Sequence, residues 1–131
     1  MPVLDTEVLF AFNPNDKKHK TISKILRIKG LKVPDTALLE FQIVLKARGR
    51  SCEEIREAME ALKFIFSSNK IKEVKTISTD LIILQSEIEE KYGLSYFDSL
   101  IASSALMLDK TIVSDDKAFD KIPNLRRIPL S

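Results

Sequence analysis

Apolar residues recur at helical spacing in five long stretches of this chain, and each stretch begins or ends at a capping residue, a glycine or a proline. The clearest start is Ser51, which is followed three residues later by Glu54 in the pattern of a capping box. Asp35 is a second predicted N-cap. The pattern predicts helices over about 15–29, 35–48, 51–66, 79–92 and 96–108, and a shorter helical segment over 6–12.

Short apolar or alternating segments separate these helices and predict strands. The segments are residues 2–5, 74–77, 111–114 and a last edge strand over 126–130, with a turn or short helix over 115–121. Because strands alternate with helical stretches, we expect an α/β fold with a small, mostly parallel central sheet flanked by helices. No internal repeat, low-complexity tract or linker divides the chain, so residues 1–131 are expected to form one domain.

Composition adds one constraint on binding partners. Hydrophobic residues make up 44% of the chain, which is typical of a globular protein and argues against disorder. The 21 basic and 19 acidic residues leave a net charge of only +2, so any attraction for nucleic acid must come from a local cluster. Two basic clusters are candidates, although a solvated helix face is the ordinary explanation for such runs. They consist of Lys17, Lys18, Lys20 and Lys24, and of Lys46, Arg48 and Arg50.

The cysteine count and the apolar run lengths bear on location. Cys52 is the only cysteine, which excludes an internal disulfide and a cysteine-based zinc site and favours a reducing setting. The chain shows no signal-peptide pattern, and its apolar runs are too short to cross a membrane. We therefore expect a soluble, cytoplasmic protein with no membrane partner.

Two aspartates follow predicted strands. Asp5 ends the first apolar strand, and Asp116 lies two residues beyond Ser114, where another strand ends. In open α/β sheets, ligands bind beyond the carboxyl ends of the strands, so both aspartates are candidate site residues. Each could equally cap the helical segment that follows it, and the adjacent Asp115 competes with Asp116 for either role.

Two further acids interrupt apolar surfaces of predicted helices. Asp98 shares a helix face with Ile101 and Ala105, where a charge costs several kcal/mol unless it is paired or bound to a metal. A favourable interaction with the start of its own helix is the alternative explanation for Asp98. Glu40 lies inside an apolar run, where a glutamate has no packing role.

Together, these acids predict a metal site. Carboxylates brought close to one another repel and raise one another's pKa, and a divalent cation offsets that repulsion. An all-oxygen ligand set without histidine or cysteine favours Mg²⁺ or Mn²⁺ over Zn²⁺. The predicted ligands are Asp5, Glu40, Asp98 and Asp116.

Four short motifs, taken in their order along the chain, resemble those of a PIN domain. They are residues 3–6, 39–41, 97–102 and 112–119, and the resemblance extends from the first strand to Leu130. Carried over position by position, it implies four acids that bind metal and are catalytic, and two hydroxyl residues that orient them. The acids are Asp5, Glu40, Asp98 and Asp116, and the hydroxyl residues are Thr6 and Ser114.

The resemblance also implies a function. PIN domains are metal-dependent nucleases, and many small prokaryotic members are ribonuclease toxins of the VapC type. The chain is therefore expected to be a Mg²⁺- or Mn²⁺-dependent endoribonuclease that hydrolyses RNA phosphodiester bonds, with an antitoxin protein as partner and a homodimeric assembly. The alternatives are a catalytically weak PIN-fold module that binds nucleic acid or protein in RNA processing, and an unrelated α/β protein whose acids only cap helices.

Three residues depart from the pattern of the family. Glu7 replaces a small or amide residue, Asp109 stands where glycine is common, and Asp115 adds a charge beside the fourth acid. All three are acidic, and extra negative charge opposes the approach of a phosphate. None of them removes a predicted ligand.

Overall fold

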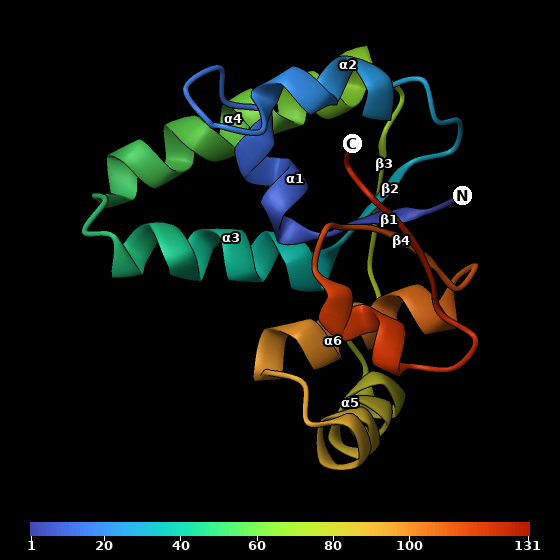
Figure 1. Cartoon of the computed structure of the whole chain (residues 1–131). Helices are drawn as coiled ribbons and strands as arrows, with labels where there is room; N and C mark the ends of the chain where they lie inside the picture. Colours follow the sequence, from blue (N-terminus) through green and yellow to red (C-terminus); the bar gives the residue numbers. More distant parts are fainter.

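Five short parallel strands form the central sheet of the computed structural model, which describes residues 1–131 (Figure 1). Their order across the sheet is β3-β2-β1-β4-β5, and all four pairings are parallel. The strands are β1 (Val3–Leu4), β2 (Lys32–Pro34), β3 (Lys72–Val74), β4 (Thr111–Val113) and β5 (Arg126–Ile128). The predicted α/β class and parallel sheet are therefore confirmed.

Six α-helices and two 3-10 helices connect the strands. In Figure 1, α5 and α6 lie on one side of the sheet, α1, α2 and α4 lie on the other, and α3 extends away from the end of β2. The α-helices are α1 (Thr6–Ala11), α2 (Ile22–Ile25), α3 (Asp35–Ala47), α4 (Cys52–Ser68), α5 (Thr79–Tyr92) and α6 (Tyr96–Met107). The 3-10 helices are η1 (His19–Thr21) and η2 (Lys117–Lys121). Layers of this kind bury a parallel sheet on both faces.

The centre of the core lies at the middle of the sheet. Side chains of β1 and β4 that point to opposite faces are both without solvent exposure, as Val3 and Leu4 show. Ile112 and Val113 of β4 are buried in the same way. This double burial explains why the strand segments read as continuous apolar runs rather than as alternating patterns.

The predicted helix over 15–29 is wrong. The chain instead makes turns up to Lys18, then η1 and the four-residue α2. Side chains hold the turns, because Asn13 Oδ1 accepts a bond from the backbone N–H of Asn15 and Asp16 Oδ2 accepts one from that of Lys18. Such side-chain bonds satisfy backbone groups locally and compete with helix formation.

The strands around β2 also differ from the prediction. No strand was predicted at Lys32–Pro34, a segment of three residues that ends in proline. The strand predicted over 74–77 lies two residues earlier, at Lys72–Val74, because Thr76 and Ile77 instead donate hydrogen bonds to Asp35. Asp35 is the first residue of α3 rather than its N-cap. The remaining predicted helices and strands are present with bounds shifted by a few residues.

None of the helices combines the length and the apolar character that crossing a membrane requires.

Candidate functional site

The candidate site lies where the chain changes direction across the sheet. From β1 the chain adds β2 and β3 on one side, and then crosses back to place β4 and β5 on the other side. Ligands of open parallel sheets bind beyond the carboxyl ends of the strands at such a position. Asp5 follows β1 and Ser114 follows β4, and the backbone N–H of Asp5 donates to the carbonyl of Val113 at 3.1 Å.

Asp5 is a buried carboxylate without a cationic partner. Its side chain accepts hydrogen bonds from the backbone N–H of Thr6 at 2.8 Å and from the hydroxyl of Ser114 at 2.7 Å. The pKa of Asp5 is raised to about 7 despite these bonds, mainly by burial and in smaller part by the carboxylates of Glu7 and Asp98. Asp5 therefore caps α1 and also holds a poorly solvated charge at the site, so the two explanations for it are compatible.

Thr6 joins the first acid to the second. Its backbone N–H bonds Asp5, and its hydroxyl donates to Glu40 Oε1 at 2.5 Å. Glu40 lies on α3, which packs against α1 through the rings of Phe10 and Phe41, whose centroids are 4.6 Å apart. This packing brings Glu40 to the start of α1, from a position 34 residues later in the sequence.

Asp98 lies at the start of α6 but does not cap it. Ser95 is the N-cap, and its hydroxyl oxygen accepts the backbone N–H of Asp98 at 3.2 Å. Partial burial raises the pKa of Asp98 to about 6, and the carboxylates of Asp116 and Glu40 contribute to the rise. The side chain of Asp98 thus faces two of the other predicted ligands.

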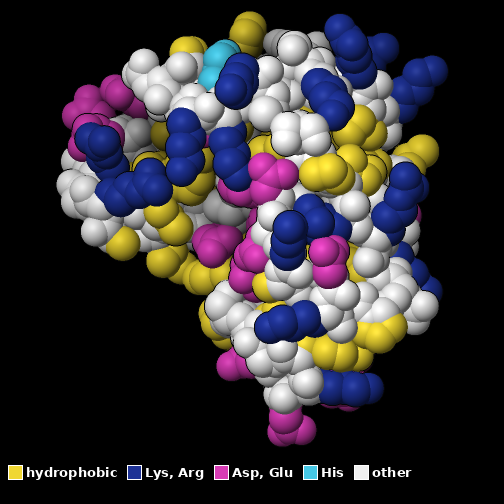
Figure 2. All heavy atoms as spheres, in the orientation of Figure 1, with side chains coloured by type: hydrophobic (Ala, Val, Ile, Leu, Met, Phe, Trp, Pro, Cys, Tyr) yellow, Lys and Arg dark blue, Asp and Glu magenta, His cyan; other side chains and the backbone are white.

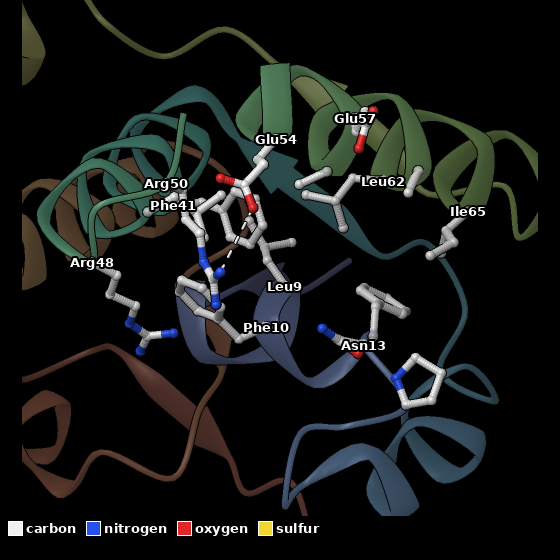
Figure 3. A pocket seen from close by; sticks show the side chains of 15 residues that line it. Leu9, Phe10, Asn13, Phe41, Arg48, Arg50, Glu54, Glu57, Leu62 and Ile65 are labelled. Atoms are coloured by element: carbon white, nitrogen blue, oxygen red, sulfur yellow. Dashed lines mark ion pairs between the residues drawn. The ribbon is translucent and has the colours of Figure 1, made fainter. Parts of the chain in front are cut away.

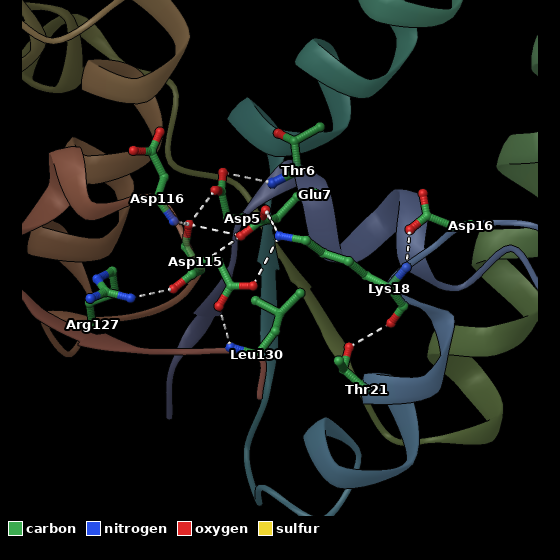
Figure 4. Close-up of polar contacts among 11 residues, drawn as sticks. Asp5, Thr6, Glu7, Asp16, Lys18, Thr21, Asp115, Asp116, Arg127 and Leu130 are labelled. Carbon is green, nitrogen blue, oxygen red and sulfur yellow. Dashed lines mark hydrogen bonds and ion pairs between the residues drawn. The ribbon is translucent and has the colours of Figure 1, made fainter.

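Asp115 and Asp116 turn in different directions. Asp116 Oδ1 accepts the backbone N–H of Ala118 at 2.9 Å, at the start of η2, and its carboxylate raises the pKa of Asp98. Asp115 instead accepts bonds from the backbone N–H of Leu130 at 2.8 Å and from Lys18 Nζ at 2.9 Å (Figure 4). Of the two, only Asp116 is oriented toward the other predicted ligands.

The four acids are brought to one region but not to one point. Their carboxylates perturb one another, yet no three His, Cys, Asp or Glu side chains converge closely enough, as they stand, to hold a metal ion. None of the four forms an ion pair with lysine or arginine. An uncompensated set of oxygen donors fits a hard divalent cation, provided that the side chains turn toward a common centre. The site residues concerned are Asp5, Glu40, Asp98 and Asp116.

A second charge network at the site was not predicted from the sequence. Lys18 Nζ lies 3.0 Å from Glu7 Oε2 and 2.9 Å from Asp115 Oδ2, so one ammonium pairs with two carboxylates (Figure 4). Arg127 of β5 also supports this region, because its guanidinium donates to the carbonyl of Ser114 at 3.1 Å and pairs with Asp120. In the sequence Lys18 is one lysine in a basic run, and nothing in that run distinguishes it.

An apolar groove of about 580 Å³ lies between α1, α3 and α4 (Figure 3). Its lining includes Phe41, the residue after Glu40 on α3, and Phe10 of α1, the helix that Thr6 begins. Arg48 and Arg50 lie at its polar end, and Arg48 stacks over the ring of Phe10 at 4.7 Å. The groove was not predicted from the sequence, since its lining comes from three separate helices.

The surface around the acids carries both signs of charge. Figure 2 shows acidic side chains gathered in and beside the central hollow of one face, with lysine and arginine side chains around it. A negative centre with a basic rim suits a ligand that is anionic overall and that meets a bound cation at the centre.

Comparisons with known proteins were made for the sequence and for the fold. A model of the family described as PIN domain matches residues 3–125. No curated protein sequence matches the chain. Among solved structures, a toxin–antitoxin complex from Klebsiella pneumoniae has a TM-score of 0.70 at 15% identity and covers 100% of this chain and 98% of its own.

Two further solved structures have the same fold. VapBC2 from Rickettsia felis, bound to a DNA fragment from its promoter, has a TM-score of 0.69 at 20% identity, covering 97% of this chain and 96% of its own. The Mycobacterium tuberculosis toxin VapC20, which cleaves the sarcin–ricin loop, has a TM-score of 0.70 at 17% identity, covering 92% and 93%. At these identities the similarity shows the fold alone.

Proposed function

The chain belongs to the PIN domain family, and on this premise we propose that it is a Mg²⁺- or Mn²⁺-dependent endoribonuclease, the toxin of a toxin–antitoxin pair. The observation that carries the proposal is the group of four acids at the direction change of the sheet, none of which has a cationic partner. The all-oxygen set supports a hard divalent cation. The VapC20 structure, described as a toxin that cleaves the sarcin–ricin loop, supports RNA as the substrate.

We assign the side chains distinct roles in holding the cation. Asp5, Asp98 and Asp116 would be its main ligands, and Glu40 would bind directly or through water. When bound, the cation would supply charge stabilisation for the phosphate and lower the pKa of a water molecule. The hydroxyls of Thr6 and Ser114 orient Glu40 and Asp5.

Basic residues near the groove would bind the substrate. Arg48 and Arg50 are exposed at its polar end, and Lys46 is exposed in the last turn of α3. A cluster of this kind attracts the phosphate backbone, although the net charge of the molecule is only +2. RNA of the cytoplasm is the proposed substrate pool, which agrees with the single, unpaired Cys52.

The Asp98→Asn variant tests the proposed activity. Asparagine keeps the shape of the side chain but removes a charged ligand, so we expect cleavage of RNA in the presence of Mn²⁺ to fall about 100-fold or more. Cleavage of structured and unstructured RNA should be compared with Mg²⁺, with Mn²⁺ and with EDTA. Circular dichroism checks that the variant is folded.

A matched control is Asp80→Asn, which changes an exposed aspartate in the first turn of α5. It should cleave RNA at the wild-type rate. RNA cleavage that persists in EDTA, or that survives Asp98→Asn, would contradict the proposed mechanism. A protein that binds RNA but cleaves none with either metal would instead favour the alternative of a binding module.

The partner we propose is an antitoxin whose extended or helical segment occupies the apolar groove between α1, α3 and α4. The Klebsiella pneumoniae structure is described as a toxin–antitoxin complex, and the Rickettsia felis structure as VapBC2 bound to promoter DNA. The groove has room for several side chains, and Phe41 in its lining directly follows Glu40 on α3. A basic side chain of the antitoxin could therefore reach the acids from this groove and block the site.

We also propose a homodimer. Large apolar side chains remain exposed on and beside α5, where Ile77, Ile82 and Ile83 are 48%, 43% and 54% exposed. Neighbouring apolar residues left in water favour a protein contact more than scattered ones do. A second copy of the chain is the proposed occupant of this face.

A further inference from the structure

The extra acids beside the site are arranged differently from the four proposed ligands. Glu7 and Asp115 share the ammonium of Lys18, whereas the proposed ligands pair with no base. Hydrogen bonding to Asp115, together with Glu7, raises the pKa of Lys18, so the ammonium stays charged across the physiological range. The two extra carboxylates are thus compensated within the protein, and the charge that opposes phosphate approach is reduced.

The hydroxyl of Ser114 lies between two carboxylates. It is 2.7 Å from Asp5 Oδ2 and 3.1 Å from Glu7 Oε1, and its oxygen accepts the backbone N–H of Asp116. A serine hydroxyl has a single proton, so it can donate a full hydrogen bond to only one of these acceptors at a time. The shorter distance gives the proton to Asp5.

Other donors occupy both carboxylate oxygens of Glu7, which lies within hydrogen-bond distance of the Ser114 hydroxyl. Its Oε2 accepts from Lys18, and its Oε1 accepts the backbone N–H of Asp115. Lys18 comes from the turn after α1 and Asp115 from the turn after β4, so the ammonium joins two segments that are 97 residues apart (Figure 4). Without Lys18, the full charge of Glu7 would compete with Asp5 for the hydroxyl of Ser114.

We propose that Lys18 is a positioning residue of the nuclease, which holds Glu7 so that the hydroxyl of Ser114 stays on Asp5. This inference rests on the proposed function, because Asp5 is one of the proposed metal ligands. Lys18 touches neither a proposed ligand nor the apolar groove; it acts through Glu7 and Ser114. Hydrogen-bonding partners of metal ligands commonly contribute on the order of 10-fold to 100-fold in affinity or activity.

The test uses two double variants of equal net charge. Lys18→Met should lower kcat for RNA and weaken Mn²⁺ binding by about 10-fold, because Asp5 loses its oriented hydroxyl bond. Lys18→Met with Glu7→Gln should recover both values to those of Glu7→Gln alone, because the competing charge is gone. Lys18→Met with Asp115→Asn should not recover them, because Asp115 does not contact Ser114 through its side chain.

The Mn²⁺ affinity, measured by calorimetry, separates the proposed positioning role of Lys18 from a simple effect of its positive charge. Removing a cation beside carboxylates should tighten Mn²⁺ binding if only Coulomb attraction mattered, whereas the proposal expects weaker binding. Equal recovery by the two double variants, or tighter Mn²⁺ binding by Lys18→Met, would overturn the role of Lys18. If Lys18 only fastened the two turns, neither double variant would recover, which would overturn the proposal as well.

The same measurements distinguish this inference from the proposed function. Wild-type protein that binds Mn²⁺ but cleaves no RNA would refute the ribonuclease assignment, while the Mn²⁺ affinities of the variants would still decide the role of Lys18. Wild-type protein that binds no Mn²⁺ would refute both. Melting temperatures show whether each variant is folded, and Lys18→Arg, which keeps the charge, should lose less Mn²⁺ affinity than Lys18→Met.

Discussion

At the scale of single residues, the site is defined by which carboxylates have a partner for their charge. Asp35 shows how a partly buried aspartate can be satisfied without a cation, since it accepts the N–H groups of Thr36, Thr76 and Ile77 and a threonine hydroxyl. Asp5 has two donors only, and Asp98 faces other acids. Their raised pKa values express the cost of keeping them ionised in the metal-free protein.

The raised pKa values predict how stability depends on pH. The folded-state pKa values of about 7 for Asp5 and about 6 for Asp98 exceed the unfolded-state value near 3.9, so the folded state takes up protons first as pH falls. In EDTA, stability should therefore rise as pH is lowered from about 7.5 to about 5.5. Melting temperatures of wild type and of an Asp5→Asn, Asp98→Asn double variant measure this.

The double variant should lack most of this rise, and groups common to both proteins cancel in the difference. Saturating Mn²⁺ should also suppress the rise, because the cation replaces the protons. The opposite result would contradict this prediction. If the wild-type melting temperature in EDTA falls relative to the double variant as the pH is lowered, burial does not disfavour the ionised forms of Asp5 and Asp98.

At the scale of elements, helix ends and turns decide where the functional groups are placed. The capping box at Ser51 and Glu54 is present and starts α4, which forms one wall of the groove. A cap of this kind contributes about 1 kcal/mol to stability. The turns over 13–18, which replace the predicted helix, allow Lys18 to reach across to Glu7 and Asp115. The proposed positioning role of Lys18 therefore depends on a segment that does not form regular structure.

The groove makes a prediction about α4. If an antitoxin segment occupies it, Ala61→Glu, which places a charge on an exposed lining position, should weaken the complex with the antitoxin by about 10-fold or more. The partner to test is the product of a small adjacent gene that encodes a DNA-binding protein, purified and measured by calorimetry. Ser67→Glu, on the same helix outside the lining, should bind like wild type.

Two results would remove the groove from the proposal. One is equal binding by Ala61→Glu and wild type, and the other is the absence of any complex with such a gene product. RNA cleavage by Ala61→Glu without the antitoxin reports separately on the site, because Ala61 lines the groove and is none of the four proposed ligands.

At the scale of the whole molecule, the candidate site lies beyond the carboxyl ends of the central strands, and exposed apolar residues lie elsewhere. The strand order places the carboxyl ends of β1 and β4 side by side, and every acid of the site lies on a segment that begins near these strand ends. The exposed isoleucines beside and on α5 are not part of the groove. They remain available for contact with another copy of the chain.

The proposed dimer can be tested on α5. Ile83→Asp should convert a dimer to a monomer, since a charge buried in an apolar interface costs several kcal/mol. Light scattering coupled to size-exclusion chromatography gives the mass. Phe64→Asp is the control, because Phe64 is 73% exposed but lies on α4, and it should leave the mass unchanged. A monomeric wild type, or a dimer that persists in Ile83→Asp, would contradict the proposed interface.

The sequence by itself determined the fold class and marked the four acids as candidate ligands, because both follow from local patterns. Helical spacing and caps mark α3 to α6 within a few residues, and the acids stand out where strands end or where apolar faces are interrupted. β2 escaped prediction because a three-residue strand that ends in proline carries too little periodicity to recognise. Its place in the sheet depends on its neighbours, not on its own residues.

Only the tertiary structure decided how the charges around the acids are partnered. The pairing of Lys18 with Asp115 joins segments that are 97 residues apart, so no local pattern encodes it. Tertiary packing likewise decides that Asp116, and not Asp115, faces Asp98. The groove likewise exists only after three helices pack. Local sequence fixes which groups are present, and long-range packing fixes which of them remain uncompensated and thus available to a cation.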